Sequence, residues 1–487
     1  MAPPLPTSAR PARATPAPDF LEALNLRDVV LMTVVAVVSL RWVARGALAG
    51  PSSVTLWLLA AAAFFAPLGA AVAELASRYP EQGGIYAWTR RAFGPAHGFV
   101  CGWCLWVNNL FYFPSLLLFG AANALAVFGD RYAALAGSRV YAVAFVLAAL
   151  WLLVGVNVIG LGAGKWLQNV GSAGTWIPAA LLIGSGAVAF AWFGSAASFA
   201  PAALVPPIER DAIGTLGLWS AMCFAFSGIE ITSLVGREVK APRRTIPAGV
   251  LIAGAAIAAI YILGSASIVV AVPAGELDEL SGIADAVSVV GARVGLGALG
   301  GLTGGLLAIA AIAGTAAWVA GAARVPFAAG VDRAMPAWFG RLHPRYRTPH
   351  VALVVQGLAS SAILLASVFL SFTSERTSLE DAYGIMVNLT ILVYFVPYLY
   401  LFLAFVRLRA EAETPAPGEI RAPGGRAGLW LVGGSGLAAT AISIALTFAP
   451  PPATASVVNY EVSLILQAAV VLGVGGLLYR RSENSRI

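Results

Sequence analysis

The chain has 487 residues, of which 59% are hydrophobic and 11% are charged, whereas about 25% of the residues of a soluble domain are charged. A water-soluble fold of this size needs far more polar side chains to cover its surface, so the composition excludes a soluble enzyme. The apolar residues form long blocks, which indicates an all-α polytopic membrane protein.

Residues suited to cofactor or metal chemistry are scarce. The three cysteines lie in apolar runs, which predicts buried packing thiols rather than a disulfide scaffold. All three histidines fall outside those runs, so a membrane-embedded haem would lack its ligands. The glycine-rich phosphate-binding pattern of ATPases is absent from the sequence. We therefore expect no cofactor, no metal and no enzymatic activity.

The chain divides into a polar tail and twelve apolar runs. Residues 1–26 are rich in Pro and Ala without an apolar core, which predicts a disordered tail and not a signal peptide. Each later run is long enough to cross about 30 Å of hydrocarbon. The runs lie near residues 28–48, 54–76, 97–127, 138–159, 166–193, 212–236, 247–272, 298–328, 349–372, 381–407, 427–449 and 458–479.

Twelve spans place both termini on one side of the membrane, and the basic residues indicate which side. Of the 30 Lys and Arg residues, 23 lie in the tails and the loops on the side of the termini, and 6 lie on the other side. We therefore expect both termini to be cytoplasmic, and the net charge of +7 needs no nucleic-acid partner to explain it. The outer loops are mildly acidic, which indicates solvated loop charge or an entrance suited to cationic solutes.

The first run contains a charged residue close to mid-bilayer. Its centre reads Val37-Val38-Ser39-Leu40-Arg41-Trp42, and a guanidinium stays ionised even there. Arg41 could pair with a carboxylate such as Glu230, contact the carboxylate of a transported solute, or extend outward together with Arg45. The sequence leaves these three alternatives open.

The third run carries adjacent asparagines, Asn108 and Asn109, followed by Tyr112. Side-chain amides in lipid need hydrogen-bond partners, so we expect at least one of them to face the interior of the bundle. In the eighth run Trp318 lies among small residues, where it either covers a cavity or simply packs.

The sixth run has the features of a helix that unwinds within the membrane. A transporter can hold a polar solute on the free backbone groups of such breaks. Ser227 and Gly228 lie at the centre of this run, and Glu230 follows two residues later. A carboxylate in lipid is costly unless it is paired, protonated or hydrated, so Glu230 is a functional candidate. The alternative is a glycine packing notch beside a structural Glu.

Four stretches combine into a specific pattern. They are Ala49–Pro51; Glu74–Tyr86 with Phe93, Gly94, Gly102 and Trp103; Phe224–Glu230 with Glu238–Pro247; and Arg324–Asp332 with Met335, Pro336 and Arg347–Pro349. With these motifs the chain, from about residue 26 to its C-terminus, resembles the amino acid–polyamine–organocation superfamily of secondary transporters.

The resemblance implies two inverted five-helix repeats of the LeuT-like kind, about residues 27–193 and 212–408, which form a core over 27–408. Two peripheral membrane helices would follow at 427–480. It also implies a substrate site between broken first and sixth helices. By position, the candidates for substrate binding are Ser39, Leu40, Arg41, Asn109, Tyr112, Phe224, Ala225, Ser227, Gly228 and Trp318. Glu230 and Arg41 are the candidates for coupling.

Two positions depart from the family pattern. The break in the first helix usually reads Gly-Ser/Ala-Gly, whereas Ser39-Leu40-Arg41 stands here. We therefore expect a tighter or partly helical break in which Arg41 recognises a carboxylate. Some proton-coupled relatives carry a lysine three residues before Pro178, where this chain has Thr175. The coupling ion therefore stays open.

These features predict a secondary active transporter of amino acids in the cell membrane, driven by proton symport or exchange, that alternates access around a midplane site. Its partners would be the lipid bilayer, an amino acid and, for symport, protons; the sequence does not indicate the oligomeric state. Arg41 favours a solute with a carboxylate, because like charges repel strongly in a low dielectric. A polyamine or other organocation carrier is the alternative, and a membrane enzyme or receptor would need a larger extramembrane domain.

Overall fold

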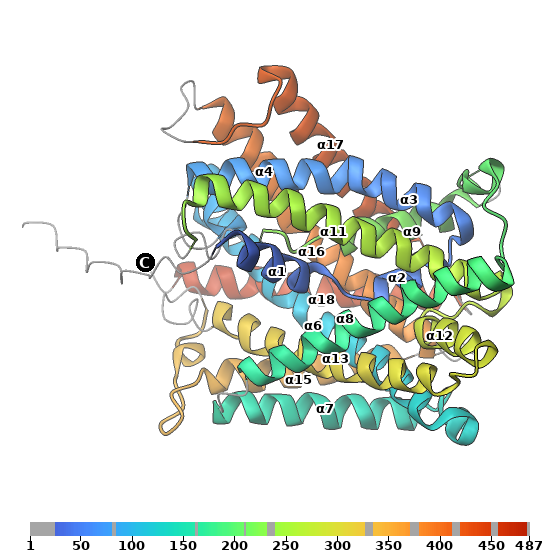
Figure 1. Cartoon of the computed structure of the whole chain (residues 1–487). Helices are drawn as coiled ribbons and strands as arrows, with labels where there is room; N and C mark the ends of the chain where they lie inside the picture. The colour runs from blue at the N-terminus through green and yellow to red at the C-terminus, as the bar shows by residue number, and fades with distance from the viewer. Residues whose placement is uncertain are drawn as a thin grey trace, which may run out of the picture.

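The computed structural model describes residues 25–79, 84–160, 164–208, 211–230, 239–326, 335–370, 379–411, 419–449 and 456–484. Throughout this part of the chain the regular elements are helices (Figure 1). Ten helical segments in it are long and apolar enough to cross a membrane. The predicted all-α membrane class is therefore confirmed, whereas residues 1–24 of the predicted tail lie outside the described residues.

The ten segments overlap ten of the twelve apolar runs. They are Gly50–Arg78, Pro95–Gly129, Arg139–Ile159, Ala173–Phe193, Arg244–Ala271, Ala298–Pro326, His350–Phe369, Leu379–Ala410, Gly425–Leu446 and Val457–Arg481. The α-helices that overlap these segments are α3 (Ser53–Ala60), α4 (Ala66–Arg78), α6 (Pro95–Leu125), α7 (Arg139–Ile159), α8 (Gly164–Val188), α11 (Pro242–Ala271), α13 (Ala298–Ala322), α15 (His350–Phe369), α16 (Leu379–Ala410), α17 (Gly425–Leu446) and α18 (Val457–Asn484). Two shorter helices, α5 (Ile85–Phe93) and α12 (Gly282–Arg293), lie between these segments.

Within the described residues, the first and sixth runs form no continuous helical segment of membrane length. The first run forms α1 (Leu26–Val37) and α2 (Arg41–Ala47), separated by three residues. The sixth begins as α9 (Ala212–Ala225) and continues as turns through residue 230. The predicted continuation to residue 236 lies outside the described residues.

The break in the first run forms without a glycine. Val38 is extended, with φ −68° and ψ 114°, and helical geometry resumes at Leu40. The expected partly helical break agrees with the helical geometry of Leu40, whereas Val38 is extended and interrupts the helix. A β-branched valine adopts the extended conformation readily, so side-chain contacts rather than glycine flexibility specify this break.

Two central helices organise the bundle. α6 packs against α13 and α16, and α16 also packs against α17. In the most apolar stretches of α6 and α16, 67% and 72% of the residues are buried, compared with 22% in α18. A side chain at Gly304 of α13 would come within 2.6 Å of the carbonyl oxygen of Asn123 in α6. The two backbones therefore approach as closely as glycine permits, which is typical of helix packing in membranes.

The outer helices flank this centre. In Figure 1 the long helices run roughly side by side, with α17 on one flank and α7 on the other. α17 packs on α4, α9 and α16, and α11 packs on α1, α2 and α8. All three cysteines are free and buried, as predicted for packing thiols. The helix packing thus brings α1, α2, α9 and α11 together around the break between α1 and α2 and the end of α9.

Candidate functional site

The hydroxyl of Tyr261 joins the end of α1 to the end of α9. Tyr261 lies in α11, and its side chain is fully buried. Its hydroxyl oxygen lies 3.0 Å from the carbonyl oxygen of Val37 and 3.0 Å from the carbonyl oxygen of Ala225. It also accepts a hydrogen bond of 3.3 Å from the backbone N–H of Ser39. Val37 and Ala225 end α1 and α9, so both helix ends meet at one side chain from a third helix.

Arg41 is a buried cation with unused hydrogen-bonding capacity. Its side chain is 1% exposed, and Nη1 donates a hydrogen bond of 3.0 Å to Oγ of Ser115 in α6. The guanidinium carbon lies 4.4 Å from the ring centre of Trp42 and 4.6 Å from that of Tyr112, so two aromatic faces stabilise the charge. Nε and Nη2 have no hydrogen-bond partner among the described residues.

The two unpartnered nitrogens form one edge of the guanidinium. Their N–H bonds are parallel, which is the geometry that binds a carboxylate through two hydrogen bonds. A buried charge without a counterion is costly. The described part of the chain supplies no carboxylate within ion-pair distance of Arg41. The free edge of Arg41 therefore has the geometry to bind a carboxylate through two hydrogen bonds.

The contacts exclude two of the alternatives considered for Arg41. Glu230 binds other groups and makes no ion pair with Arg41, so the pairing alternative is wrong. Arg41 does not extend outward together with Arg45, because its guanidinium contacts Ser115 and Tyr112 of α6 whereas Arg45 pairs with Glu279. The remaining alternative, contact with a carboxylate of a transported solute, stays a prediction.

Glu230 is held by neutral donors from α16. Its Oε1 accepts a hydrogen bond of 2.8 Å from the hydroxyl of Tyr394, and its Oε2 accepts one of 2.8 Å from the hydroxyl of Tyr398. The backbone N–H of Gly228 points between Oε2 and the Tyr398 hydroxyl, 3.0 Å from each. Gly228 has φ +105°, a conformation that favours glycine. The turn after α9 thus folds its carboxylate against α16.

Aromatic rings connect the predicted residues across helices. Phe224 of α9 lies 5.1 Å from Trp42 of α2, centre to centre, and 5.6 Å from Tyr394 of α16. Tyr112 of α6 lies 6.0 Å from Trp318 of α13. Tyr112 also contacts the guanidinium of Arg41, so α2, α6, α9, α13 and α16 all contribute to one continuous cluster around this cation.

Four further predicted residues occupy less direct positions. Asn109 donates a hydrogen bond of 2.8 Å to the carbonyl oxygen of Leu105 in its own helix, and it lies one turn before Tyr112. Leu40 is buried within the first interruption. Ser39 and Ser227 are half-buried, one in each interruption. The structure therefore brings the two interruptions together, while the amide of Asn109 is occupied by its own helix.

Sequence reasoning missed the hydroxyl groups of this site. Tyr261, Tyr394, Tyr398 and Ser115 make its main hydrogen bonds, yet none was among the candidates. A signal was present, because a tyrosine in a membrane helix needs a partner for its hydroxyl. The partners lie 36 to 224 residues away along the chain for Tyr261, so the pattern within one helix cannot identify them.

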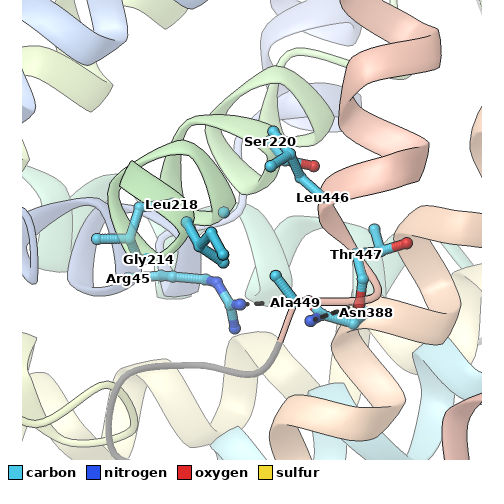
Figure 2. A pocket seen from close by; sticks show the side chains of 10 residues that line it. Arg45, Gly214, Leu218, Ser220, Asn388, Leu446, Thr447 and Ala449 are labelled. Carbon is cyan, nitrogen blue, oxygen red and sulfur yellow. Dashed lines mark hydrogen bonds between the residues drawn. The ribbon is translucent and has the colours of Figure 1, made fainter. Parts of the chain in front are cut away.

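A separate pocket lies one helical turn beyond Arg41. Arg45, Ser220, Asn388 and Thr447 are among its lining residues, from α2, α9, α16 and the end of α17 (Figure 2). Arg45 donates a hydrogen bond of 2.7 Å to Glu279 and one of 3.2 Å to Oδ1 of Asn388. Glu279 is one of the acidic residues of the predicted outer loops, and its ion pair with Arg45 shows that its charge is not simply solvated.

Membrane-length helices that surround a broken helix, the end of a second helix and a buried charge are typical of polytopic transporters. The chain belongs to the amino acid permease family, since the model of that family matches residues 24–474. The predicted resemblance to the amino acid–polyamine–organocation transporters is thereby confirmed. Within the described residues, no group of His, Cys, Asp and Glu side chains is arranged to hold a metal ion.

Characterised and uncharacterised relatives match most of the chain. An uncharacterised transporter of Legionella pneumophila is 29% identical over 88% of this chain and 90% of its own. A Lactococcus lactis protein named "Probable agmatine/putrescine antiporter AguD" is 23% identical over 96% of both chains. The serine/threonine exchanger SteT of Bacillus subtilis is 28% identical over 77% of this chain and 79% of its own.

Proposed function

We propose that the protein is a secondary active transporter of amino acids that carries its substrate between the interrupted helices α1–α2 and α9. The observation that carries the proposal is the free edge of Arg41. It is a buried, aromatic-lined guanidinium with two parallel N–H groups, and no carboxylate of the described residues forms an ion pair with it. A substrate carboxylate would complete it with two charge-assisted hydrogen bonds.

The proposed architecture has twelve spans. α1 with α2 forms the first broken span, and α9 with the chain after residue 225 forms the sixth. Spans 1–5 and 6–10 form the inverted repeats, about residues 27–193 and 212–408, and α17 and α18 are the two peripheral helices. Both termini face the cytoplasm and the protein lies in the cell membrane, which the excess of Lys and Arg in alternate loops supports.

The proposed transport cycle uses no covalent chemistry. The carboxylate of the amino acid binds Arg41, and its ammonium meets carbonyl oxygens at the ends of α1 and α9. Ser39, Leu40, Asn109, Tyr112, Phe224, Ser227, Gly228 and Trp318 surround the substrate. Arg41 and Glu230 couple occupancy to the change of access, in proton symport or substrate exchange. The relatives named as an antiporter and an exchanger support exchange.

A second candidate function is the transport of polyamines or other organocations. The relative named for agmatine and putrescine supports it, because it aligns with 96% of this chain. Arg41 disfavours it, since a cationic solute without a carboxylate would approach a buried guanidinium in a low dielectric. The two candidates therefore differ in whether uptake requires a carboxylate.

Uptake into proteoliposomes tests the proposal. We expect the purified protein to exchange at least one of the proteinogenic amino acids, tested individually, and to transport agmatine and putrescine at least tenfold more slowly. Arg41→Ala should abolish amino acid uptake, since it removes the only free cation proposed for the carboxylate. Uptake of agmatine by the wild type, with Arg41→Ala equally active, would instead establish the organocation carrier.

Arg407→Ala is the matched control for this variant. Arg407 lies near the end of α16 and forms an exposed ion pair with Glu411, so its loss should leave uptake unchanged. Both variants are compared by their apparent melting temperatures in detergent. A folded Arg41→Ala protein with unchanged amino acid uptake would disprove the binding role of Arg41.

A further inference from the structure

A turn just before α15 carries three exposed arginines, Arg341, Arg345 and Arg347. None of them forms an ion pair with another described residue. The sequence from residue 333 to residue 374 contains neither Asp nor Glu, so the neighbouring chain supplies no counterion. Three guanidinium groups therefore concentrate positive charge at one place on the surface.

Hydrogen bonds within this turn hold its backbone in one conformation. The N–H of His343 donates to the carbonyl oxygen of Thr348 at 2.8 Å, and the N–H of Arg347 donates to the carbonyl oxygen of His343 at 2.9 Å. Nδ1 of His343 accepts hydrogen bonds of 3.2 Å from the backbone N–H groups of Arg345 and Tyr346. Arg347 is thereby held at φ +57°, a conformation that favours glycine. The turn is thus preorganised, and its backbone does not have to become ordered when a ligand binds.

The turn lies at the level where membrane helices end. Oγ1 of Thr348 donates a hydrogen bond of 2.6 Å to the carbonyl oxygen of Val158, in the last turn of α7. α15 begins two residues after Thr348, at His350. Because α7 and α15 are both of membrane length, the arginines lie where phospholipid headgroups meet water.

Two apolar side chains beside the turn are also exposed, Trp338 of η8 (Ala337–Gly340) and Leu342, each by 41%. The ring of Trp338 stacks on Phe339 at 4.1 Å and 21°, and Phe339 is buried against Trp106 of α6. A tryptophan on such a fixed base suits the headgroup region of a bilayer. Arginines next to exposed apolar side chains match a lipid, which is anionic and apolar at once, better than a free anion.

We propose that the arginine turn, residues 341–348, binds the headgroup of an anionic phospholipid. The guanidinium groups donate paired hydrogen bonds to the phosphate oxygens, and Trp338 and Leu342 contact the apolar part of the same lipid. Arg78, also at the end of a membrane helix, is not available in this way because it pairs with Glu419. The inference is independent of the transported solute, so it stands or falls separately from the proposed function.

The thermal stability of the purified protein in a neutral detergent tests the proposal, because a ligand that binds only the folded state raises the apparent melting temperature. The probes are dioctanoyl phosphatidylglycerol, dioctanoyl phosphatidylcholine and inorganic phosphate. We expect phosphatidylglycerol to raise the melting temperature by several degrees, with saturation, and the other two probes to have little effect. Equal stabilisation by both lipids would show that the anionic headgroup is not recognised. Equal stabilisation by inorganic phosphate would show a site for small anions. Either result would overturn the proposal.

Replacement of the three arginines by glutamine localises the effect, in the variant Arg341→Gln/Arg345→Gln/Arg347→Gln. Glutamine removes the charge but keeps a polar side chain. Since juxtamembrane arginines each add to the binding of anionic lipids, we expect the half-saturating concentration of phosphatidylglycerol to rise about tenfold or more. An unchanged concentration in the folded variant would place the lipid site elsewhere and overturn the proposal.

The matched control makes the same change of net charge at exposed arginines of α16, α17 and α18, in the variant Arg407→Gln/Arg426→Gln/Arg481→Gln. Its half-saturating concentration should stay within about twofold of the wild-type value. Equal weakening in both triple variants would mean that the lipid responds to the overall charge of the protein, and the arginine turn would lose its assignment.

Salt dependence gives a test that needs no variant to fold. Between about 0.1 M and about 0.5 M sodium chloride, screening should raise the half-saturating concentration of phosphatidylglycerol for the wild type at least about threefold. The weak effect of phosphatidylcholine should not change. Binding of phosphatidylglycerol that is insensitive to salt would contradict contact between exposed arginines and the phosphate.

Discussion

Arg41 and Glu230 are both buried close to the interrupted helices, yet their environments differ. The guanidinium rests between two aromatic rings with one edge free, whereas the carboxylate is bound by two tyrosine hydroxyls and the N–H of Gly228. The cation has capacity for a further partner, and the carboxylate ties α9 to α16. The two residues are therefore suited to different tasks, the first to binding and the second to linking substrate occupancy with helix position.

The hydrogen bonds of Glu230 make it sensitive to a change of one atom. In Glu230→Gln an amide NH2 group replaces one carboxylate oxygen and faces a donor, either a tyrosine hydroxyl or the N–H of Gly228. A buried unsatisfied donor costs about 1–3 kcal/mol. We expect the apparent melting temperature in detergent to fall by several degrees and uptake to fall about tenfold or more. Unchanged uptake would show that Glu230 has no part in coupling.

Arg41→Lys separates charge from geometry at the same site. Lysine keeps the positive charge but loses the parallel N–H pair and the stacking on Trp42 and Tyr112. We expect Lys to restore only a minor part of the uptake lost in Arg41→Ala, with the KM for the amino acid raised about tenfold or more. Full activity of Arg41→Lys would mean that a fixed charge suffices and that carboxylate recognition lies elsewhere.

At the scale of single helices, a buried ion pair joins α4 to α16. Arg409 near the end of α16 donates a hydrogen bond of 2.8 Å to Glu74 of α4, and the backbone N–H of Ala422 donates one of 2.8 Å to the same carboxylate oxygen. The side chains of Glu74 and Arg409 are 3% and 8% exposed. Removal of one partner from such a pair leaves a buried charge without a counterion.

Two arginines on α16 allow a matched comparison of burial. Arg409→Ala breaks the buried pair with Glu74. The removal of one partner of a buried ion pair lowers the free energy of unfolding by about 3–5 kcal/mol, so we expect the apparent melting temperature to fall by several degrees. Arg407→Ala, two residues earlier, breaks an exposed pair worth about 0–1 kcal/mol and should shift it by about one degree at most. Equal shifts would mean that burial of the Glu74 pair does not stabilise the contact between α4 and α16.

Helix positions were predictable from the sequence because each depends on apolar runs of membrane length. The break after α9 was also predictable, since Ser227 and Gly228 weaken the helix locally. The contacts of the site were not, because each depends on residues far apart: Glu230 and Tyr398 are separated by 168 positions, and Arg45 and Glu279 by 234. The break at Val38–Leu40 belongs to this second kind, because a tyrosine 222 positions from Ser39 binds Val37 before the break and Ser39 within it.

At the scale of the whole molecule, the proposed twelve spans and the ten continuous membrane-length segments of the described residues imply different topologies. Both numbers are even, so both place the two termini on the same side. The two topologies differ in the side of the membrane on which they place the loops between the first and sixth runs. If the first and sixth runs do not cross the membrane, residues 79–94 and 272–297 lie on the same side. If both cross, these two loops lie on opposite sides.

Cysteine labelling distinguishes the two topologies. Ala96 and Ala274 are both exposed, at the start of α6 and in the segment before α12, and the three native cysteines are buried. With twelve spans and cytoplasmic termini, a membrane-impermeant maleimide added to intact cells should label Ala274→Cys and not Ala96→Cys. Permeabilised cells should label both. Labelling of both variants in intact cells would support ten spans, and it would remove the basis for a substrate site between two broken helices that cross the membrane.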